Sequence, residues 1–438
     1  MDILDYLSKL GKKEYIRKNY SLDNIRNALD LLDSPHKKIK NVIHITGTNG
    51  KGSVAIYTSR LLNVLGYTTG LFISPHIFDV TERIQYNNEP IKKEILKKYL
   101  SDIYYKLPNS LFLKLTYFEI LTCVMFLYFF DMKPDFIVLE VGLGAKLDAT
   151  NVIDESLVSC ITSISLDHTE VLGKTEWDIL KDKSHIIKPN SIFVCGELKS
   201  DFKKYLKNLC KLLNTKFVYC KNDIYDLKFC VKNWKTFCKF KINNKIYTAS
   251  FPVCSASQPY NLKISLEIIK QLYENKLIKE PNYKVIFKEV SKIIIPFRMQ
   301  KFNFKKYEII VDGAHNPGSI SNFVNLLKKL KLKEFIICFT MMKDKDYITA
   351  IKILSRVRKE ICKFIVYKTN NVRSQNINLL YKEALKNFDR EKVIKISNIN
   401  SLLKYIENFC IQKKIFFVGS FYASLVFKNK LWKRIFTM

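Results

Sequence analysis

The sequence predicts an α/β protein in which helices cover parallel sheets. Residues 41–45 form a short apolar run that leads into a turn with three glycines, and an apolar helix pattern follows at 54–65. Two further short apolar runs, 136–139 and 158–164, end beside polar residues. Short apolar strands that alternate with helices are typical of a parallel sheet that is buried on both faces.

Apolar spacing predicts two helices in the first third of the chain. Ile25, Leu29 and Leu32 have helical spacing within the first forty residues. The most apolar run, 120–130, is too short to cross a bilayer and is followed by Asp131, so it predicts a buried helix.

The chain changes in character after residue 195. Residues 195–253 are basic and partly alternating, which predicts a small β-rich antiparallel segment or insertion. Pro296 and Arg298 then indicate a linker at 291–302, so we expect two domains, 1–295 and 296–438. The other elements expected after residue 260 are a helix at 262–272, strands at 307–311, 335–339 and 414–418, and a helix that starts at Ile320.

Composition limits the class of protein. With 438 residues, of which 47% are hydrophobic, the chain has room for two or three domains and is not largely disordered. Lysine and arginine number 73 against 41 acidic residues, a formal net charge of +32 that favours anionic partners such as nucleic acid, phosphates or acidic metabolites. Enrichment in Lys, Asn, Ile, Tyr and Phe along the whole chain supports a second interpretation, a general compositional bias with lysine as an ordinary surface residue.

The cysteines and the N-terminus bear on cellular location. The eleven cysteines are dispersed and include no CxxC pair, which predicts reduced thiols inside a cell and no zinc site. The first twenty residues contain Asp2 and Asp5 and no apolar core, so we expect no secretory signal and a cytoplasmic protein.

The turn TGTNGKGS, residues 46–53, predicts a phosphate-binding loop. Glycines let backbone N–H groups point at phosphate oxygens, and the following helix N-terminus adds its dipole. Lys51 supplies a positive charge for the β- and γ-phosphates, and Ser53 supplies a hydroxyl for Mg²⁺. The spacing departs from GxxxxGK[ST], and a tight turn without a ligand is the alternative interpretation.

Eight stretches along the chain resemble, in order, the branch of the Mur ligase superfamily that contains folylpolyglutamate synthase and dihydrofolate synthase. Together they are a specific match, although LDHT or DGAHN alone is weak. The resemblance implies a P-loop ATPase-like parallel-sheet domain followed by a smaller, Rossmann-like C-terminal α/β domain. Besides TGTNGKGS, the stretches are SPHIFDVTERIQ (74–85), LTYFE (115–119), LEVGLGAKLDATN (139–151), LDHTEVLG (166–173), KDKSHIIKP (181–189), DGAHNP (312–317) and VGSFY (418–422).

The resemblance also implies roles for the residues at matching positions. The catalytic residues would be Lys51, Lys183 and His315. ATP would be held by Gly50, Lys51, Gly52, Ser53, Asn261, Arg298 and Asp312. Two Mg²⁺ ions would be held by Ser53, Ser74, Glu140 and His168, with a carbamylated Lys183 facing the second ion. Judged without the resemblance, His168 is more typical of a structural histidine, and Lys183 of an exposed lysine on a helix that begins near Glu176.

A pterin substrate would lie against two further segments. These are Thr116, Tyr117, Phe118 and Glu119, and Leu147, Asp148 and Ala149. An aromatic ring such as Phe118 can stack on a pterin or aryl ring. The alternative interpretations are a helix N-terminus with Thr116 as its cap and Phe118 in the core, and an Asp148 that only caps local backbone.

The chain departs from the family pattern at several positions. Ala145 and Lys146 stand where glycine and arginine are common, and Phe297 stands where glycine usually precedes the arginine. Lysine keeps the charge of arginine but loses its bidentate fork. Gln258 and Asn261 are kept, without the usual glycine–histidine before the glutamine.

We therefore expect an ATP-dependent ligase that joins L-glutamate to dihydropteroate, giving dihydrofolate, and to folylpolyglutamates, through an acyl phosphate. The expected partners are these small molecules, ATP and magnesium, with no nucleic acid, no membrane and a monomeric chain. One alternative is another amino-acid ligase of the Mur superfamily, against which LTYFE, SPH and LDATN argue. The other is a nucleic-acid-binding ATPase, for which the sequence has no recognisable module.

Overall fold

The computed structural model describes residues 3–13, 21–304, 307–369, 371–409 and 413–422, which form two compact units. Unit 1 comprises Met1–Ser165, Leu172–Asn222 and Asn261–Ile286, and unit 2 comprises Leu166–Val171, Asp223–Tyr260 and Phe287–Met438. The expected division into domains 1–295 and 296–438 stays a prediction, since residues 223–260 and 166–171 group with unit 2.

Unit 1 is built on an eight-stranded sheet with the strand order β4-β3-β2-β5-β1-β6-β7-β8. Its strands are β1 (Val42–Thr46), β2 (Thr69–Phe72), β3 (Ile84–Tyr86), β4 (Glu89–Pro90), β5 (Phe136–Glu140), β6 (Val158–Ile161), β7 (Ile192–Cys195) and β8 (Lys216–Tyr219). Strands β2, β5, β1, β6, β7 and β8 are parallel, and β3 and β4 pair antiparallel at one edge. Every residue of β1, β5 and β6 is buried, so the predicted parallel α/β class is confirmed.

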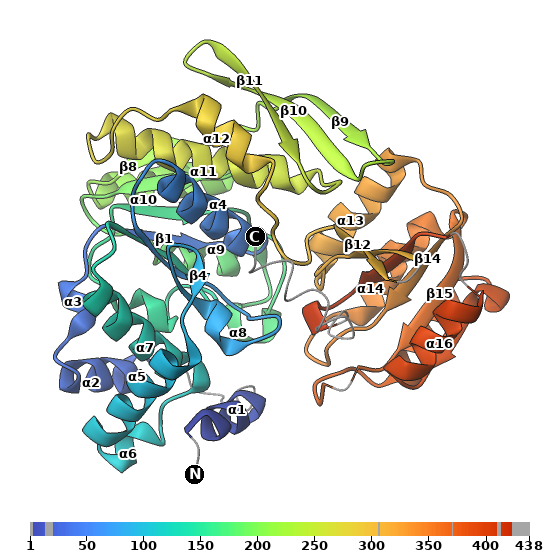
Figure 1. The fold of residues 1–438 in the computed structure, drawn as a ribbon, viewed down its shortest axis with the longest axis horizontal. Helices are drawn as coiled ribbons and strands as arrows, with labels where there is room; N and C mark the ends of the chain where they lie inside the picture. The colour runs from blue at the N-terminus through green and yellow to red at the C-terminus, as the bar shows by residue number, and fades with distance from the viewer. Residues whose placement is uncertain (1–2, 14–20, 305–306, 370, 410–412, 423–438) are drawn as a thin grey trace. The chain divides into compact units, whose positions relative to one another are not determined.

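Helices lie on both sides of these strands (Figure 1). The helices up to residue 290, apart from one short helix in unit 2, are α1 (Ile3–Lys13), α2 (Asp23–Leu31), α3 (Pro35–Lys38), α4 (Lys51–Val64), α5 (Lys93–Lys106), α6 (Asn109–Phe112), α7 (Tyr117–Met132), α9 (Glu176–Ser184), α10 (Ser200–Leu212), α11 (Ser257–Glu274) and α12 (Tyr283–Val290), with 3-10 turns η2 (Val80–Arg83) and η3 (Ala149–Val152). Helix α7 confirms the buried helix expected at 120–130.

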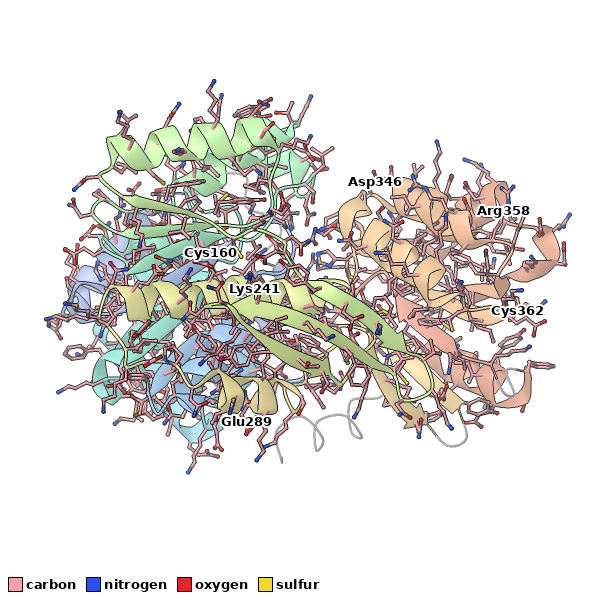
Figure 2. The ribbon with its side chains drawn as sticks, turned by 90° about the horizontal axis from the view of Figure 1, so that it is seen from above. Cys160, Lys241, Glu289, Asp346, Arg358 and Cys362 are labelled. Carbon is pink, nitrogen blue, oxygen red and sulfur yellow. The ribbon has the colours of Figure 1, made fainter. Side chains whose placement is uncertain are left out.

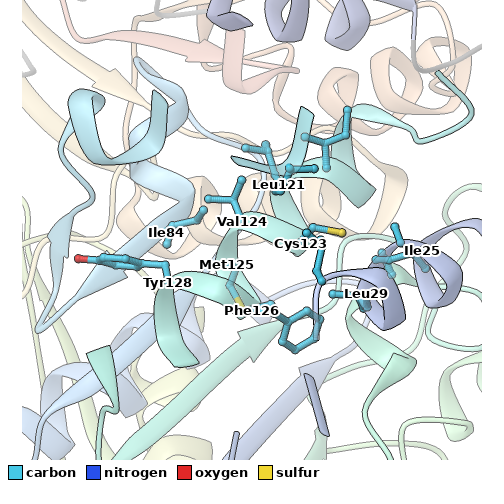
Figure 3. Packing of buried hydrophobic residues seen from close by; sticks show 14 of the residues in the cluster. Ile25, Leu29, Ile84, Leu121, Cys123, Val124, Met125, Phe126 and Tyr128 are labelled. Atoms are coloured by element: carbon cyan, nitrogen blue, oxygen red, sulfur yellow. The ribbon is translucent and has the colours of Figure 1, made fainter. Parts of the chain in front are cut away.

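The largest described core cluster joins α2, α5 and α7 to the sheet. Figure 3 shows Cys123 and Phe126 of α7 beside Leu29 of α2, while Val124 lies beside Ile84 of β3. All five side chains are fully buried, and apolar burial of this kind supplies most of the free energy that holds helices on a sheet.

The β-rich prediction for residues 195–253 is wrong in its first part. Helix α10 occupies Ser200–Leu212, because Phe202, Leu206 and Cys210 form a buried stripe at helical spacing among the lysines. The antiparallel sheet starts later and has the order β11-β10-β9, with strands β9 (Tyr225–Cys230), β10 (Lys235–Ile242) and β11 (Lys245–Phe251). Lys241 lies on β10 (Figure 2).

Unit 2 contains a six-stranded sheet with the order β12-β13-β17-β14-β15-β16, in which all neighbours except β12 and β13 are parallel. Its strands are β12 (Gln300–Phe304), β13 (Tyr307–Val311), β14 (Phe335–Phe339), β15 (Ile361–Tyr367), β16 (Val393–Ile396) and β17 (Ile415–Val418). Its helices are α8 (Thr169–Leu172), α13 (Pro317–Leu330), α14 (Tyr347–Leu354), α15 (Ile377–Asn387) and α16 (Ile399–Phe409), with 3-10 turns η4 (Ser355–Val357) and η5 (Arg390–Lys392). The expected linker at 291–302 thus ends in a strand, whereas the strands predicted at 307–311 and 335–339 are confirmed.

The cysteines of the described residues are free thiols. Cys160 lies in the unit 1 sheet and Cys362 on β15, as Figure 2 shows, while Cys410 lies outside the described residues. No helix in the described part of the chain combines the length and the apolar character needed to cross a membrane.

The order of the unit 1 sheet determines where a ligand fits. Strand β1 lies between β5 and β6, and the chain reverses its direction of travel across the sheet at this point. In open parallel sheets, ligands bind outside the carboxyl ends of the strands at such a switch point. Residues 47–50, Glu140 and Thr162 follow or end these three strands.

Buried His44 in β1 predicts a pH dependence of folding. Burial, together with Lys188, lowers the pKa of His44 to about 3, and its Nε2 lies 2.8 Å from Thr150 Oγ1. The unfolded chain, with a histidine pKa near 6.5, then binds more protons than the folded chain between pH 6.5 and 3. The free energy of unfolding should therefore fall as pH falls through this window, by about 1 kcal/mol per pH unit from this residue.

The measurement is urea-induced unfolding of wild type and His44→Gln between pH 7 and 4. The variant lacks the titrating imidazole. Its free energy of unfolding should therefore rise relative to that of wild type as the pH falls. Parallel curves for the two proteins would contradict the assignment.

Candidate active site

The loop between β1 and α4 has the backbone geometry of a phosphate cradle. Gly47 and Gly50 have φ angles of 146° and 90°, where residues with a side chain are strained. A Cβ on Gly47 would lie 2.1 Å from Thr162 Oγ1, so no side chain fits there. Lys51 opens α4, and its Nζ donates to Gly47 O at 2.9 Å, folded back over the loop.

Segment 162–165 holds this loop in place. Thr48 N donates to Ser163 O at 2.8 Å, and Asn49 N donates to Ser163 Oγ at 2.9 Å. Thr162 Oγ1 donates to Asn49 O at 2.7 Å. Strand β6 ends at Ile161, earlier than the predicted residue 164. Thr162 N still donates to Thr46 O of β1, and from Ser163 onward the segment bonds to the loop.

Glu140, at the end of β5, lies over the first turn of α4. A Cβ on Gly52 would lie 3.2 Å from both carboxylate oxygens of Glu140. Glu140 Oε2 also accepts a hydrogen bond from Ser74 N at 2.8 Å. Ser53 follows Gly52 and is 1% exposed. Three of the four residues expected at magnesium are therefore gathered in unit 1.

These groups suit magnesium better than a transition metal. The described residues contain no group of three or more His, Cys, Asp or Glu side chains that could hold a metal ion. Mg²⁺ is usually held by one or two carboxylates together with hydroxyl, water and substrate phosphate oxygens. One carboxylate with two serines, beside a phosphate cradle, fits that preference.

Asn261 lies beside the loop, as its expected role at the nucleotide requires. It belongs to α11 and is 7% exposed. A Cβ on Gly50 would lie 2.7 Å from Asn261 Oδ1, so this side chain and the loop backbone are in close contact.

Lys183 is buried, so the interpretation as an exposed lysine is wrong. Helix α9 begins at Glu176, where that interpretation placed it, yet Lys183 is 3% exposed. The preceding Asp182 accepts a hydrogen bond from Ala145 N at 2.8 Å, which fixes the loop after β5 to α9. Lys146, which stands where the family commonly has arginine, lies in the same loop and is exposed. Its charge is therefore in contact with solvent and needs no partner within the protein.

Two interpretations were weighed for segment 116–119: a pterin contact, and a helix N-terminus with Phe118 in the core. The structure has features of both. Thr116 is the N-cap of α7, in a reciprocal capping box with Glu119. Phe118 is half-buried, with its ring centroid 5.6 Å from that of Phe72. A Cβ on Gly142 would lie 2.7 Å from Phe118 Cζ and 3.1 Å from Asp148 Oδ2, so this ring and this carboxylate converge on one glycine.

Asp148 caps local backbone, as the simpler interpretation expected. Oδ1 accepts hydrogen bonds from Thr150 N at 3.0 Å and Thr150 Oγ1 at 2.5 Å, and Oδ2 accepts one from Leu143 N at 2.9 Å. Burial raises the pKa of Asp148, and these hydrogen bonds oppose the rise. The backbone N–H of Gly142 also lowers the pKa of Asp148, so local donors engage most of the acceptor positions of this carboxylate. Leu147, in contrast, is 45% exposed, and Ala149 is buried.

Unit 2 carries the other expected nucleotide residues at the end of β13. Asp312 accepts hydrogen bonds from Ala314 N and Met299 N, both at 2.9 Å. Burial raises the pKa of Asp312, and Arg298 opposes this. Arg298 lies over the Phe421 ring, 4.8 Å from its centroid. Phe297, which stands where the family usually has glycine, has φ 55°, in the left-handed region that glycine prefers. The burial of its whole side chain offsets the backbone strain of this conformation.

A buried ion pair in unit 2 brings His168 and His315 together. Lys345 Nζ lies 2.8 Å from Asp167 Oδ1 and 3.0 Å from His168 Nε2, with the lysine 8% and the aspartate 10% exposed. His315 Nε2 lies 4.0 Å from Asp167 Oδ2, and Asn316 Nδ2 donates to the same oxygen at 2.8 Å. Although burial would raise it, Lys345 and the two histidines hold the pKa of Asp167 well below its usual range.

His315 is neutral in this arrangement. Burial and Lys345 lower its pKa to about 4, although Asp167 opposes the change. Its Nδ1 donates to Gly313 O at 2.7 Å, which leaves Nε2 as an acceptor. His168 Nε2 accepts a hydrogen bond from Lys345 at 3.0 Å, and the role of His168 as a magnesium ligand stays a prediction.

Comparison with known proteins decides the family. Residues 297–421 match the glutamate ligase domain of the Mur ligases. The chain is 33% identical over 319 residues to dihydrofolate synthetase of Saccharomyces cerevisiae, which covers 70% of this chain and 72% of the relative. It is 30% identical over 431 residues to dihydrofolate synthase/folylpolyglutamate synthase of Buchnera aphidicola subsp. Schizaphis graminum, covering 96% and 94%. The chain belongs to the dihydrofolate synthase/folylpolyglutamate synthase family.

A solved structure of this family has the same fold. Folylpolyglutamate synthase of Mycobacterium tuberculosis, complexed with ADP and AMPPCP, matches 98% of this chain and 99% of its own with a TM-score of 0.83 at 23% identity. The family, fold class and ligase class expected from the sequence are therefore confirmed.

Some site residues of this family member were not predicted from its sequence. Lys345 and Asp182 act on residues distant in sequence, Asp167 and Ala145, and no local spacing connects them. Asp167, Asp182 and Asn316 lie inside the recognised stretches LDHTEVLG, KDKSHIIKP and DGAHNP, so those stretches were the available signal. Arg83 lies within SPHIFDVTERIQ in the same way.

The ion pair predicts a strong coupling between Lys345 and Asp167. Lys345→Met leaves a buried carboxylate without its cation and should lower the free energy of unfolding by about 3 kcal/mol or more. Asp167→Asn combined with Lys345→Met should be more stable than Lys345→Met alone, because the uncompensated charge is gone.

Urea-induced unfolding measures all three variants. Lys37→Met is the control, since Lys37 and its partner Asp30 are both exposed and the loss of their ion pair should barely change stability. If Lys345→Met is as stable as Lys37→Met, the Asp167–Lys345 pair does not stabilise unit 2.

Proposed function

We propose that this protein joins L-glutamate to dihydropteroate, giving dihydrofolate, and also extends the glutamate tails of folates, with ATP as the energy source. One observation carries the proposal: the cradle at 47–53 lies beside Glu140, and Phe118 and Asp148 converge on Gly142, two residues further along the same loop of unit 1. A site that binds phosphates next to a site for an aryl ring suits a reaction that phosphorylates a carboxylate on an aromatic substrate. Family membership supports this reaction.

The chemistry requires two steps. A carboxylate oxygen of the pterin substrate attacks the γ-phosphorus of ATP, the bond to the β-phosphate oxygen breaks, and ADP leaves. The amine nitrogen of glutamate then attacks the acyl carbon, the C–O bond to phosphate breaks, and the amine loses a proton. The first step turns a poor leaving group into phosphate, and the second step forms the amide.

The chain's own residues supply charge and position for these steps. Backbone N–H groups of the loop and the Lys51 ammonium bind phosphate oxygens and offset the charge that develops there. Asn261 fixes the loop on the other side. The neutral Nε2 of His315 accepts a hydrogen bond from the incoming glutamate amine, and Arg298 and Asp312 bind the nucleotide.

Magnesium fits the oxygens of Ser53, Ser74 and Glu140, and when bound it would neutralise phosphate charge. We propose in addition that Lys183 is carbamylated, which converts its cationic amine into an anion, and that His168 belongs to the same site. The burial of Lys183 supports this, because a lysine that served only for solubility would extend into water. A cytoplasmic location and a monomeric state are also proposed, from the sequence features given above.

Mass spectrometry of the products tests the proposed function. Dihydropteroate and tetrahydrofolate, each incubated with ATP, magnesium and glutamate, should both gain the mass of a glutamyl residue. Lys51→Ala should abolish both reactions while circular dichroism stays unchanged, because the side chain binds phosphate and lies outside the core.

Lys40→Ala is the matched control for Lys51→Ala. Lys40 is exposed just before β1, so its loss should leave turnover intact. Near-wild-type ligation by Lys51→Ala would show that the loop does not hold the reacting phosphates, and no ATP-dependent glutamylation by wild type would refute the proposed function itself.

The carbamylation of Lys183 predicts a rescue. Lys183→Ala should lose ligation, and a short carboxylic acid in the buffer should restore part of it by replacing the missing anion. Lys181→Ala, on the same helix but exposed, should behave as wild type in the same assay. Full activity of Lys183→Ala without any added acid would contradict the proposed carbamylation of Lys183.

A further inference from the structure

Arg83 is a nearly buried cation without an anionic partner among the described residues. It ends η2 and is 8% exposed. Its Nε donates to His76 Nδ1 at 3.0 Å, and its guanidinium carbon lies 5.1 Å from the centroid of the Tyr117 ring. These two contacts leave the forked Nη1 and Nη2 groups for another ligand.

The acidic residues beside Arg83 are engaged elsewhere. Glu82 accepts hydrogen bonds from the backbone N–H groups of Ile77, Phe78 and Asp79, at 2.6 to 2.8 Å. Asp79 caps η2 and forms an ion pair with Lys93 at 3.0 Å. Neither carboxylate is within ion-pair distance of the guanidinium.

An unpaired guanidinium in such a position is costly. Burying a charge without a counter-ion is unfavourable, and contacts with a ring face and one imidazole nitrogen offset this only in part. Nη1 and Nη2 are not among the fully enclosed atoms that lack a partner in the described chain, so they remain open to a ligand. The forked geometry of these groups matches a carboxylate, which can accept two parallel hydrogen bonds.

The contacts of Arg83 place it between the two halves of the proposed site. Tyr117 immediately precedes Phe118, whose ring lies with Asp148 around Gly142. On the other side, His76 is two residues from Ser74, whose N–H binds Glu140 beside the phosphate cradle. A substrate with its ring at Phe118 and its carboxylate directed at the cradle would pass Arg83.

We propose that Arg83 binds the carboxylate of the pterin-bearing substrate and holds it for attack on ATP. This inference rests on the proposed function and adds to it a residue that recognises the reacting group. It also separates two requirements on the substrate: the ring is recognised by Phe118 and Asp148, and the acid by Arg83. The proposal predicts that the protein distinguishes a carboxylate from a neutral group through this one side chain.

The experiment compares dihydropteroate with its carboxamide, in which the acid is neutral. Binding of each is measured by calorimetry on wild type, Arg83→Met and Arg83→Lys, and KM is measured for dihydropteroate, ATP and glutamate. Wild type should bind the acid about 10- to 100-fold more tightly than the amide, because a pair of charge-assisted hydrogen bonds contributes about this factor to affinity. Arg83→Met should bind both equally, with KM raised for dihydropteroate alone, and Arg83→Lys should fall between.

Two controls separate recognition from a structural role. Arg26→Met removes an exposed arginine from α2 of the same unit and should match wild type in every measurement. A purely structural Arg83 would weaken the acid and the amide by the same factor, so its loss would leave the preference between them unchanged. If Arg83→Met does not fold, the same comparison in Arg83→Lys and Arg83→Gln decides.

The outcomes that overturn the proposal are distinct. Retained preference for the acid in the folded variants refutes it, and so does a raised KM for ATP with an unchanged KM for dihydropteroate, which would assign Arg83 to a phosphate. A wild-type protein that ligates dihydropteroate but binds acid and amide equally refutes the inference and leaves the proposed function standing. A wild-type protein that ligates neither dihydropteroate nor folates refutes the proposed function instead.

Discussion

The close approach of Glu140 to the first turn of α4 is the constraint on which the unit 1 site depends. Both carboxylate oxygens lie 3.2 Å from the position that a Cβ on residue 52 would take, and Oε2 accepts a hydrogen bond from Ser74 N. One acidic residue at the end of β5 therefore positions both the phosphate cradle and the segment that leads to Arg83. Because β5 is the buried neighbour of β1, the sheet itself fixes the distance between these parts.

Most polar groups of the site are held by backbone atoms. Asp148, Asp312 and Thr162 all bond to main-chain groups, and each thereby fixes the shape of a loop. Fixed dipoles and charges need no rearrangement when charge develops in a reaction, which makes such loops suitable for phosphoryl transfer. The same bonds explain why carboxylates remain tolerable at buried positions, since an unsatisfied buried acid is costly.

In unit 2 the ion pair of Asp167 and Lys345 has an organising role. Asp167 belongs to a six-residue segment, Leu166–Val171, that lies within the sequence of unit 1 but groups with unit 2. Lys345 and Asn316 bind its carboxylate from two different loops. The short stretch LDHT therefore connects the two units along the chain, and its histidine is oriented by a lysine from nearly 180 residues away.

Local chemistry allowed much of this to be predicted. Strands 307–311 and 335–339 and the cradle at 46–53 were recognisable because each depends on neighbouring residues: apolar runs, glycines and helix caps. The sequence also determined the family, since eight ordered stretches carry it. Helix α10 was missed because its three buried apolar residues are spaced among many lysines. Strand β12 was missed because a strand at the edge of a sheet forms through pairing with its neighbour, here β13.

Only the tertiary structure decided which side chains are buried and what they contact. Lys183 is enclosed, Asp148 binds local backbone, Lys345 pairs with Asp167, and Arg83 lacks an anion, and none of these follows from spacing along the chain. Burial and pairing are set by segments that meet through the order of the sheets, at sequence separations that no local pattern records. By itself, the sequence determined the fold class, the family and the motifs, and the packing of distant segments decided the electrostatic surroundings of each functional group.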